Sequence, residues 1–344
     1  MSKKIAVLIT TYGEVEEPTL KNLFPNSRLI LQRITATIAN ISKPLEFFIA
    51  AVRSVNRKKL WTKTGYRSQL NAINERQAKA IAAELKTLAP EDVSFDVLPA
   101  YYFIPPLIED MLEKVKGYDG VIIAPMIPVE SAFACGIACN VVLKQWGDTA
   151  FATTRVLHGL WNDVALVKMF ANHVFENLGE ASSLKKGLIL AVHGTLTKDT
   201  KGNPPQTHTG LRETHAFYEN LRDVILADAR NPFASIKLGA LNHTYGGTWM
   251  PETFELALEE LKHEGVEEVS AFAYGFFADN SESDFEAVSL LNAAPFAKKT
   301  YIPCINDAPE FSKWMAAKIL SSTKLMTGDM VEIPREQPAE TLNG

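Results

Sequence analysis

The sequence Leu188-Ile189-Leu190-Ala191-Val192-His193-Gly194 has the pattern of a strand buried on both faces, followed by a polar side chain and a residue that permits a tight turn. Short apolar runs of this kind are typical of parallel sheets, because helices cover both faces of such a sheet. His193 then lies at the carboxyl end of its strand, where open α/β proteins bind ligands. An imidazole at this position either takes part in chemistry or anchors the loop that follows.

Similar apolar runs recur along the whole chain, and amphipathic helical patterns separate them. Strands are predicted at 5–9, 93–98, 121–125, 150–155, 187–192, 236–241, 269–273 and 300–302, and helices at 70–88, 105–115, 164–178, 209–226 and 251–263. Alternation of strands with helices implies right-handed βαβ units. We therefore predict an α/β protein with two similar doubly wound domains, each containing a four-stranded parallel sheet flanked by helices.

The strands divide into two sets near residues 157–163. This division predicts an N-terminal domain at 1–157 and a C-terminal domain at 158–322, with a cleft where the two face each other. Region 22–64 has much helical pattern and little strand, so we expect it to be an insertion that covers the cleft. The tail 323–344, rich in Glu, Pro, Thr and Gly, is predicted to be disordered.

Composition excludes several classes of protein. The 344 residues are 47% apolar and 22% charged, and the net charge of −5 argues against a nucleic-acid-binding protein. No apolar run approaches the roughly 20 residues that span a bilayer, and the N-terminus has the pattern of a first strand rather than of a signal peptide. Three cysteines, Cys135, Cys139 and Cys304, do not make a disulfide framework. We expect a cytoplasmic location.

A second candidate for chemistry follows the strand at 269–273. Glu282 and Glu286 are four residues apart, so on a helix they would share one face. Acidic residues are also common at helix N-termini for electrostatic reasons alone, and Asp279 or Ser281 would serve as a cap. This structural explanation is sufficient for the segment taken by itself.

His193 and Glu282 become more informative as a pair, because both follow buried strands of the same half. An imidazole nitrogen and a carboxylate oxygen are a donor set suited to a divalent transition metal. A Rossmann dehydrogenase would instead need G-x-G-x-x-G after a strand, and the sequence contains no such motif.

Several motifs, in this order and at this spacing, resemble the ferrochelatases, enzymes that insert ferrous iron into a porphyrin. The resemblance extends from the first strand to about Leu320. Its anchors are Tyr12-Gly13, Gly65-Tyr66-Arg67-Ser68-Gln69-Leu70, Ala191-Val192-His193-Gly194, Trp249-Met250-Pro251-Glu252-Thr253 and Gly275-Phe276-Phe277-Ala278-Asp279-Asn280-Ser281-Glu282-Ser283.

The resemblance implies a role for individual residues. His193 matches the active-site histidine of the family and Glu282 its catalytic glutamate. Glu286 matches an acidic position one turn further along the same helix. Tyr12 matches a position that lines the porphyrin cleft, and Trp249 matches a tryptophan behind the metal-side wall.

The implied activity is insertion of Fe²⁺ into protoporphyrin IX or coproporphyrin III, with release of two protons. His193 is the natural base, and Glu282 passes protons onward or holds the metal, although these roles are interchangeable on sequence grounds. The predicted metal ligands are His193, Glu282 and Glu286. Iron is a substrate rather than a resident cofactor, and no iron–sulfur cluster is expected because no cysteine follows Cys304.

Porphyrin propionates require basic partners. Arg67 is the predicted porphyrin-binding arginine, with Arg28 and Arg33 as further candidates, although each also fits an ordinary surface charge. The segment 47–61 combines aromatic with basic residues and predicts peripheral contact with the inner face of the membrane.

Two departures from the family pattern keep alternatives open. Asn280 replaces a family histidine, and Leu241-Asn242-His243 stands where a Gln-Ser pair is usual. The first departure favours a non-catalytic tetrapyrrole- or haem-binding protein derived from the same fold. A small cobalt or sirohydrochlorin chelatase would be expected to have two active-site histidines, and the sequence clearly places only His193, with His243 a weak second.

Overall fold

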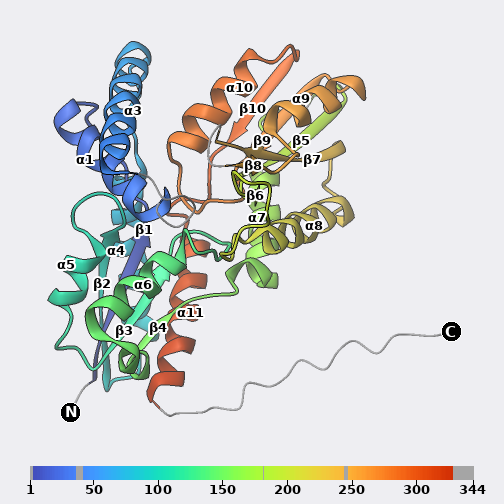
Figure 1. Cartoon of the computed structure of the whole chain (residues 1–344). Helices are drawn as coiled ribbons and strands as arrows, with labels where there is room; N and C mark the ends of the chain where they lie inside the picture. Colours follow the sequence, from blue (N-terminus) through green and yellow to red (C-terminus); the bar gives the residue numbers. More distant parts are fainter. Residues whose placement is uncertain (1–2, 36–41, 181, 244–246, 328–344) are drawn as a thin grey trace.

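A computed structural model describes residues 3–35, 42–180, 182–243 and 247–327. It contains two four-stranded parallel sheets, with strand order β2-β1-β3-β4 in the first half and β10-β9-β5-β7 in the second (Figure 1). The predicted fold class is confirmed. The first sheet is formed by β1 (Lys3–Thr11), β2 (Val93–Tyr101), β3 (Gly120–Pro125) and β4 (Thr154–Val156).

Helices cover both faces of the first sheet, which explains the continuous apolar run of its central strand. Ile5, Val7 and Ile9 face α4 (Leu70–Leu88), whereas Ala6 and Leu8 face α5 (Ile108–Lys114) and α6 (Cys135–Trp146). Alternate side chains of a strand point to opposite faces, so a strand covered on both sides must be apolar at every position.

The second sheet is built in the same way. Its strands are β5 (Lys186–His193), β7 (Phe233–Leu241), β9 (Glu268–Phe272) and β10 (Lys298–Ile302). One face packs on α7 (Val164–Glu176) and α8 (Leu211–Ala227), and the other on α9 (Phe254–His263) and α10 (Val288–Ala293). The central strand β5 therefore directs His193 toward the first half.

Three local predictions need correction. Predicted strand 150–155 is strand only at Thr154–Val156, since Asp148–Ala152 forms the 3₁₀-helix η2. The acidic segment after β9 begins as a π-helix, η4 (Ser281–Ala287), and its N-cap is Asn280 rather than Asp279 or Ser281. A small antiparallel pair, β6 (Leu196–Lys198) and β8 (Thr248–Trp249), was not predicted.

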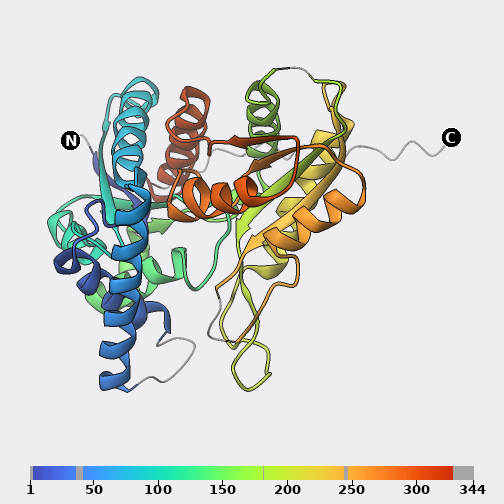
Figure 2. The same ribbon diagram turned by 90° about the horizontal axis from the view of Figure 1, so that it is seen from above.

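The last helix, α11 (Pro309–Thr327), joins the two halves. It lies between α4 and α7 (Figure 2), and its Phe311 and Ile319 share one apolar cluster with residues of both sheets. The predicted limits 1–157 and 158–322 therefore do not enclose two separate cores, and they stay a prediction. Residues 323–327 are helical rather than disordered, and the remainder of the predicted tail lies outside the described residues.

The predicted insertion 22–64 is helical in its described parts. It comprises α1 (Leu20–Ile30), the π-helix η1 (Leu31–Thr35) and the long α3 (Lys43–Thr64). Helices α1 and α3 pack against each other beyond the carboxyl end of β1 (Figure 1). Among the described residues, no helix is both long and apolar enough to cross a membrane.

Candidate active site

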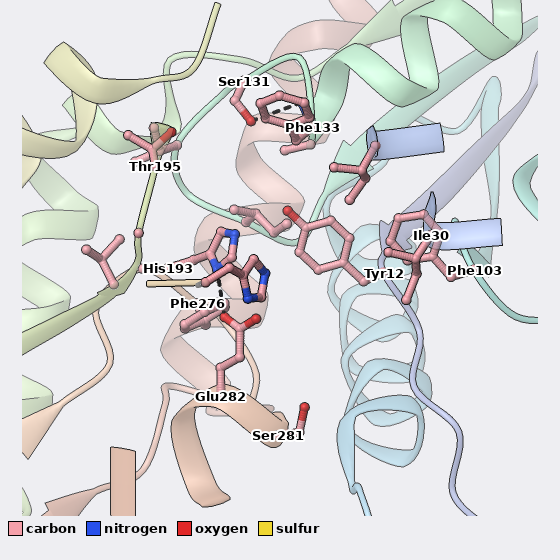
Figure 3. Close-up of a pocket in the computed structure, with 18 of the residues that line it drawn as sticks. Tyr12, Ile30, Phe103, Ser131, Phe133, His193, Thr195, Phe276, Ser281 and Glu282 are labelled. Atoms are coloured by element: carbon pink, nitrogen blue, oxygen red, sulfur yellow. Dashed lines mark hydrogen bonds and ion pairs between the residues drawn. The ribbon is translucent and has the colours of Figure 1, made fainter. Parts of the chain in front are cut away.

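A pocket opens where the carboxyl ends of the two sheets meet (Figure 3). Loops after β1, β2 and β3 form one side, and loops after β5, β7 and β9 form the other. The empty space is about 1450 Å³, counting the open mouth. The carboxyl ends of the strands are where a doubly wound fold receives a ligand.

The insertion supplies part of the wall. Ile30, Ile34, Arg53 and Arg57 line the pocket, and they come from α1, η1 and α3. Four residues of the predicted insertion therefore line the pocket, and the role of the whole insertion as a cover of the cleft stays a prediction.

His193 and Glu282 lie side by side in this pocket. His193 Nδ1 is 2.9 Å from Glu282 Oε2, and the two side chains are 33% and 25% exposed. His193 ends β5, and Glu282 lies in the first turn of η4 (Figure 3). The predicted proximity is confirmed, whereas the chemical role of each group stays a prediction.

The charges of this pair support each other. Burial alone would lower the pKa of His193, but the carboxylate of Glu282 outweighs it and raises that pKa above its ordinary value. Burial would likewise raise the pKa of Glu282, but the imidazolium of His193 holds it down at about 2. The pair is therefore an ion pair whenever the imidazole is protonated.

His243 is the third member of the cluster, in place of the predicted Glu286. Its ring centroid is 5.1 Å from that of His193, and one ligand atom each from His193, His243 and Glu282 lie within 4.8 Å of one another. Burial and the neighbouring charge of His193 lower the pKa of His243 to about 4, so its imidazole is neutral at physiological pH.

Glu286 does not belong to this cluster and is not among the described residues that line the pocket. Partial desolvation of its carboxyl group and the charge of Glu282 raise the pKa of Glu286 to about 7. This geometry gives no support to Glu286 as a metal ligand, and that role stays a prediction. A role in proton traffic one turn away stays a prediction.

Both predicted aromatic residues line the pocket. The ring of Tyr12 stacks on Phe103, with centroids 5.7 Å apart and planes 9° apart, on the side opposite His193 and Glu282 (Figure 3). Trp249 lies on the histidine side, with its ring centroid 6.1 Å from His193 and 5.2 Å from His243. The pocket thus has aromatic surfaces on both sides.

The predicted propionate-binding arginines lie elsewhere. Arg28 and Arg33 form ion pairs with Glu46 and Glu109 at 3.2 and 2.6 Å, and Arg67 is exposed. None of these three arginines is among the described residues that line the pocket.

Arg53 and Arg57 are the arginines that line it instead. They are four residues apart on α3, so they share one face of the helix. Sequence reasoning assigned them to a membrane-facing segment together with Trp61. In the structure Trp61 is buried, at 2% exposure, and the guanidinium of Arg57 lies over its ring. The four-residue spacing of Arg53 and Arg57 in the sequence indicates that they share a helix face. Which face of α3 meets the pocket depends on the tertiary structure.

Sequence reasoning also missed Glu14, which ties η4 to the first half. Glu14 follows β1, and its carboxylate accepts hydrogen bonds from the Ser68 hydroxyl at 2.6 Å and from the Ser281 backbone N–H at 3.0 Å. The Ser281 hydroxyl donates to the same carboxylate. These bonds connect the residue next to Glu282 with β1 and with the segment before α4.

Asn280, the departure from the family pattern, has a clear structural role. Its side-chain oxygen accepts from the backbone N–H groups of Glu282 at 2.9 Å and Ser283 at 3.4 Å. The Ser283 hydroxyl oxygen in turn accepts from the Asn280 backbone N–H at 2.9 Å. This reciprocal capping box fixes the helix start that carries Glu282.

Comparison with known proteins agrees with this architecture. The family model for ferrochelatase matches residues 4–323. The chain is 25% identical to a ferrochelatase of Neisseria meningitidis serogroup C, over 94% of this chain and 95% of the relative. It is 23% identical to chloroplastic ferrochelatase-2 of Arabidopsis thaliana, over 93% of this chain and 63% of that one.

A solved structure shares the fold at much lower identity. SirB from Bacillus subtilis, determined with Fe³⁺, superposes with a TM-score of 0.51 at 11% identity, covering 95% of this chain and 98% of SirB. The family match and the two parallel sheets together show that the chain belongs to the ferrochelatase family.

Proposed function

We propose that this protein is a metal chelatase that inserts Fe²⁺ into a porphyrin, protoporphyrin IX or coproporphyrin III, to make haem or its precursor, with release of two protons. The observation that carries the proposal is the His193–Glu282 pair, 2.9 Å apart, inside a large pocket with aromatic walls. Membership of the ferrochelatase family supports it.

Metallation requires a base, because two pyrrole N–H protons must leave before the ring nitrogens bind the metal. Neutral His193 accepts such a proton, and Glu282 stabilises the imidazolium that forms. Nδ1 is the ring nitrogen engaged by Glu282, so Nε2 is the atom for the substrate proton. Glu286, at about pKa 7 and one turn away, is placed to pass protons outward.

The porphyrin itself is proposed to lie between the two aromatic sides of the pocket. Tyr12 and Phe103 contact it from the first half, and Trp249 lies behind the histidines on the other. Most of the affinity for such a ligand comes from apolar contact with its faces.

The anionic substituents are proposed to bind Arg53 and Arg57, which replace Arg67 in this role because they line the pocket. A guanidinium forms bidentate hydrogen bonds with a carboxylate, so two arginines on one helix face match two propionates. Porphyrin and iron are both substrates here, and neither a resident cofactor nor an iron–sulfur cluster is proposed.

We further propose a cytoplasmic protein that contacts the inner face of the membrane peripherally through α3. Phe47 and Phe48 are 56% and 64% exposed on this helix, and Lys58 and Lys59 lie further along it. Apolar side chains beside cations favour anionic lipid surfaces. Sedimentation with vesicles of phosphatidylserine and phosphatidylcholine tests this, and equal sedimentation of a Phe47→Glu/Phe48→Glu variant would reject it.

The second candidate is a non-catalytic porphyrin- or haem-binding protein, which the Asn280 departure first favoured. Because Asn280 caps the helix that carries Glu282, its presence does not by itself indicate a degraded site. A steady-state assay with Fe²⁺ or Zn²⁺ and porphyrin, run beside a Soret-band binding titration, separates the two. Turnover supports the chelatase, and binding without turnover supports the binding protein.

A further inference from the structure

The cluster of His193, His243 and Glu282 carries an inference about the metal rather than the porphyrin. We propose that these three side chains form a complete metal site of the protein itself, with His243 as the third ligand, which holds the divalent metal before the porphyrin arrives. The inference rests on the proposed function only for the identity of the ion delivered. The site should also bind a test metal when no porphyrin is present.

The distances fit such a site after a small adjustment. Ligand atoms from the three residues lie within 4.8 Å of one another. Metal–nitrogen and metal–oxygen bonds of about 2.1 Å place two ligand atoms about 3–4 Å apart, so the longest separation between ligand atoms needs to shorten by at most about 1–2 Å. Nδ1 of His193 and Oε2 of Glu282 are already 2.9 Å apart.

The backbone holds His243 next to His193. Strands β5 and β7 pair in parallel with His193 opposite Leu241, two residues before His243. Beyond the strands the pairing continues, because the Gly194 N–H donates to the Leu241 carbonyl at 3.0 Å. A Cβ at position 194 would lie 1.8 Å from Asn242 Oδ1, so a larger residue there would displace the Asn242 side chain.

Two further contacts keep this arrangement in place. The side-chain amide of Asn242 donates to the Met250 carbonyl at 2.7 Å, which ties the end of β7 to the segment after β8. The Trp249 ring packs edge-on against both imidazoles, with interplanar angles of 74° to His193 and 86° to His243. Both histidine rings are therefore held by packing before any metal binds, as a preorganised ligand set requires.

The donor set defines the class of metal. Two imidazoles and one carboxylate suit Fe²⁺, Co²⁺ and Zn²⁺, whereas Mg²⁺ and Ca²⁺ prefer oxygen ligands. Three protein ligands also leave coordination positions open for an incoming ligand. Pyrrole nitrogens of the porphyrin would take those positions. The metal would pass to the ring as M²⁺, and the two protons that leave the ring would go to side chains that the metal has released, His193 among them. Charge balances and no electron is transferred.

The test is a titration of the full-length protein, purified without a polyhistidine tag, with Co²⁺ alone. Visible d–d absorption reports nitrogen and oxygen ligation of Co²⁺. We expect wild type to bind one equivalent of Co²⁺ and His243→Ala to bind Co²⁺ at least about 10-fold more weakly. Even the loss of a residue that only hydrogen-bonds to a metal ligand commonly weakens metal binding by this factor. His243→Gln keeps most of the side-chain volume and is expected to behave alike.

A matched control is His263→Ala, which removes an exposed histidine at the end of α9. We expect it to bind Co²⁺ as wild type does. Circular dichroism and thermal unfolding of each variant establish that it is folded. No Co²⁺ binding by wild type, or equal binding by wild type and folded His243→Gln, would overturn the inference.

A porphyrin insertion assay on the same proteins separates this inference from the proposed function. If the protein inserts no metal but its Co²⁺ binding depends on His243, the proposed chelatase activity is rejected and the proposed metal site is supported. If wild type inserts metal and the His243 variants bind Co²⁺ as tightly as wild type does, the proposed chelatase activity is supported. His243 is then not a metal ligand.

Discussion

His193 Nδ1 lies 2.9 Å from Glu282 Oε2, although 89 positions separate the two residues in the sequence. The contact arises because β5 and β9 are neighbours in the second sheet, and because the segment after β9 turns back over the end of β5. Each residue shifts the pKa of the other, in opposite directions. The predictions below follow from this pair and from the groups that position it.

His193→Ala is expected to abolish metal insertion and leave porphyrin binding largely intact. The change removes a base and a metal ligand, and loss of a general base alone costs about 10²–10⁴ in rate. Stopped-flow or steady-state insertion assays measure the rate, and quenching of tryptophan fluorescence measures binding. Glu286→Gln, one turn away, is expected only to slow insertion, and equal losses in the two variants would identify the carboxylates as limiting.

Stability is expected to depend on pH through the same pair. Because the pKa of His193 is raised above 6.5, its contribution is complete below that value and is lost as pH rises through the folded pKa. Because the pKa of Glu282 is lowered from 4.5 to about 2, its contribution is complete above 4.5 and is lost as pH falls toward 2. The pair therefore stabilises most between pH 4.5 and 6.5.

Denaturant unfolding of wild type and Glu282→Gln across this pH range measures the effect. The difference in unfolding free energy is expected to be largest between pH 4.5 and 6.5 and to shrink on either side. NMR titration of His193 in Glu282→Gln is expected to give a lower pKa than in wild type. A difference in stability that does not vary with pH would contradict the ion pair.

Arg53→Glu and Arg57→Glu are expected to weaken binding of a dicarboxylate porphyrin by 10-fold or more each, which corresponds to about 1.4 kcal/mol. Each change replaces a pocket-lining cation with an anion. The matched control is Arg67→Glu, an exposed arginine outside the described pocket lining, which we expect to bind like wild type. Porphyrin dissociation constants from fluorescence quenching measure the effect. Weaker binding by Arg67→Glu alone would instead identify Arg67 as the porphyrin-binding arginine.

Asn280→Ala is expected to reduce stability by about 1 kcal/mol through loss of the N-cap, and to lower the insertion rate with little change in porphyrin affinity. The Glu282 backbone N–H donates to Asn280 Oδ1 at 2.9 Å, so we expect loss of this bond to move the Glu282 carboxylate relative to His193. Asn280→Asp keeps an accepting oxygen and is expected to retain both properties. Full insertion activity in a destabilised Asn280→Ala would show that the cap does not position Glu282.

Much of the fold could be predicted because its signals are local. The apolar runs of β1 and β5 are continuous, as a strand covered by helices on both faces requires, and the predicted helix 70–88 matches α4. The same reasoning failed at 150–155, where an apolar run forms a 3₁₀-helix instead of most of a strand. Short apolar runs do not distinguish the two states without their neighbours.

The site likewise contains some residues that the sequence alone identifies and others that only the tertiary structure places. His193 and Glu282 were found because each follows a buried strand, which is a property of the sequence alone. His243 became a partner of His193 only because β7 is the neighbour of β5, and strand order is set by the packing of the whole sheet. Arg53 and Arg57, rather than Arg67, line the pocket for a related reason: a helix sequence shows which residues share a face, but only the elements packed around α3 decide which face meets the pocket.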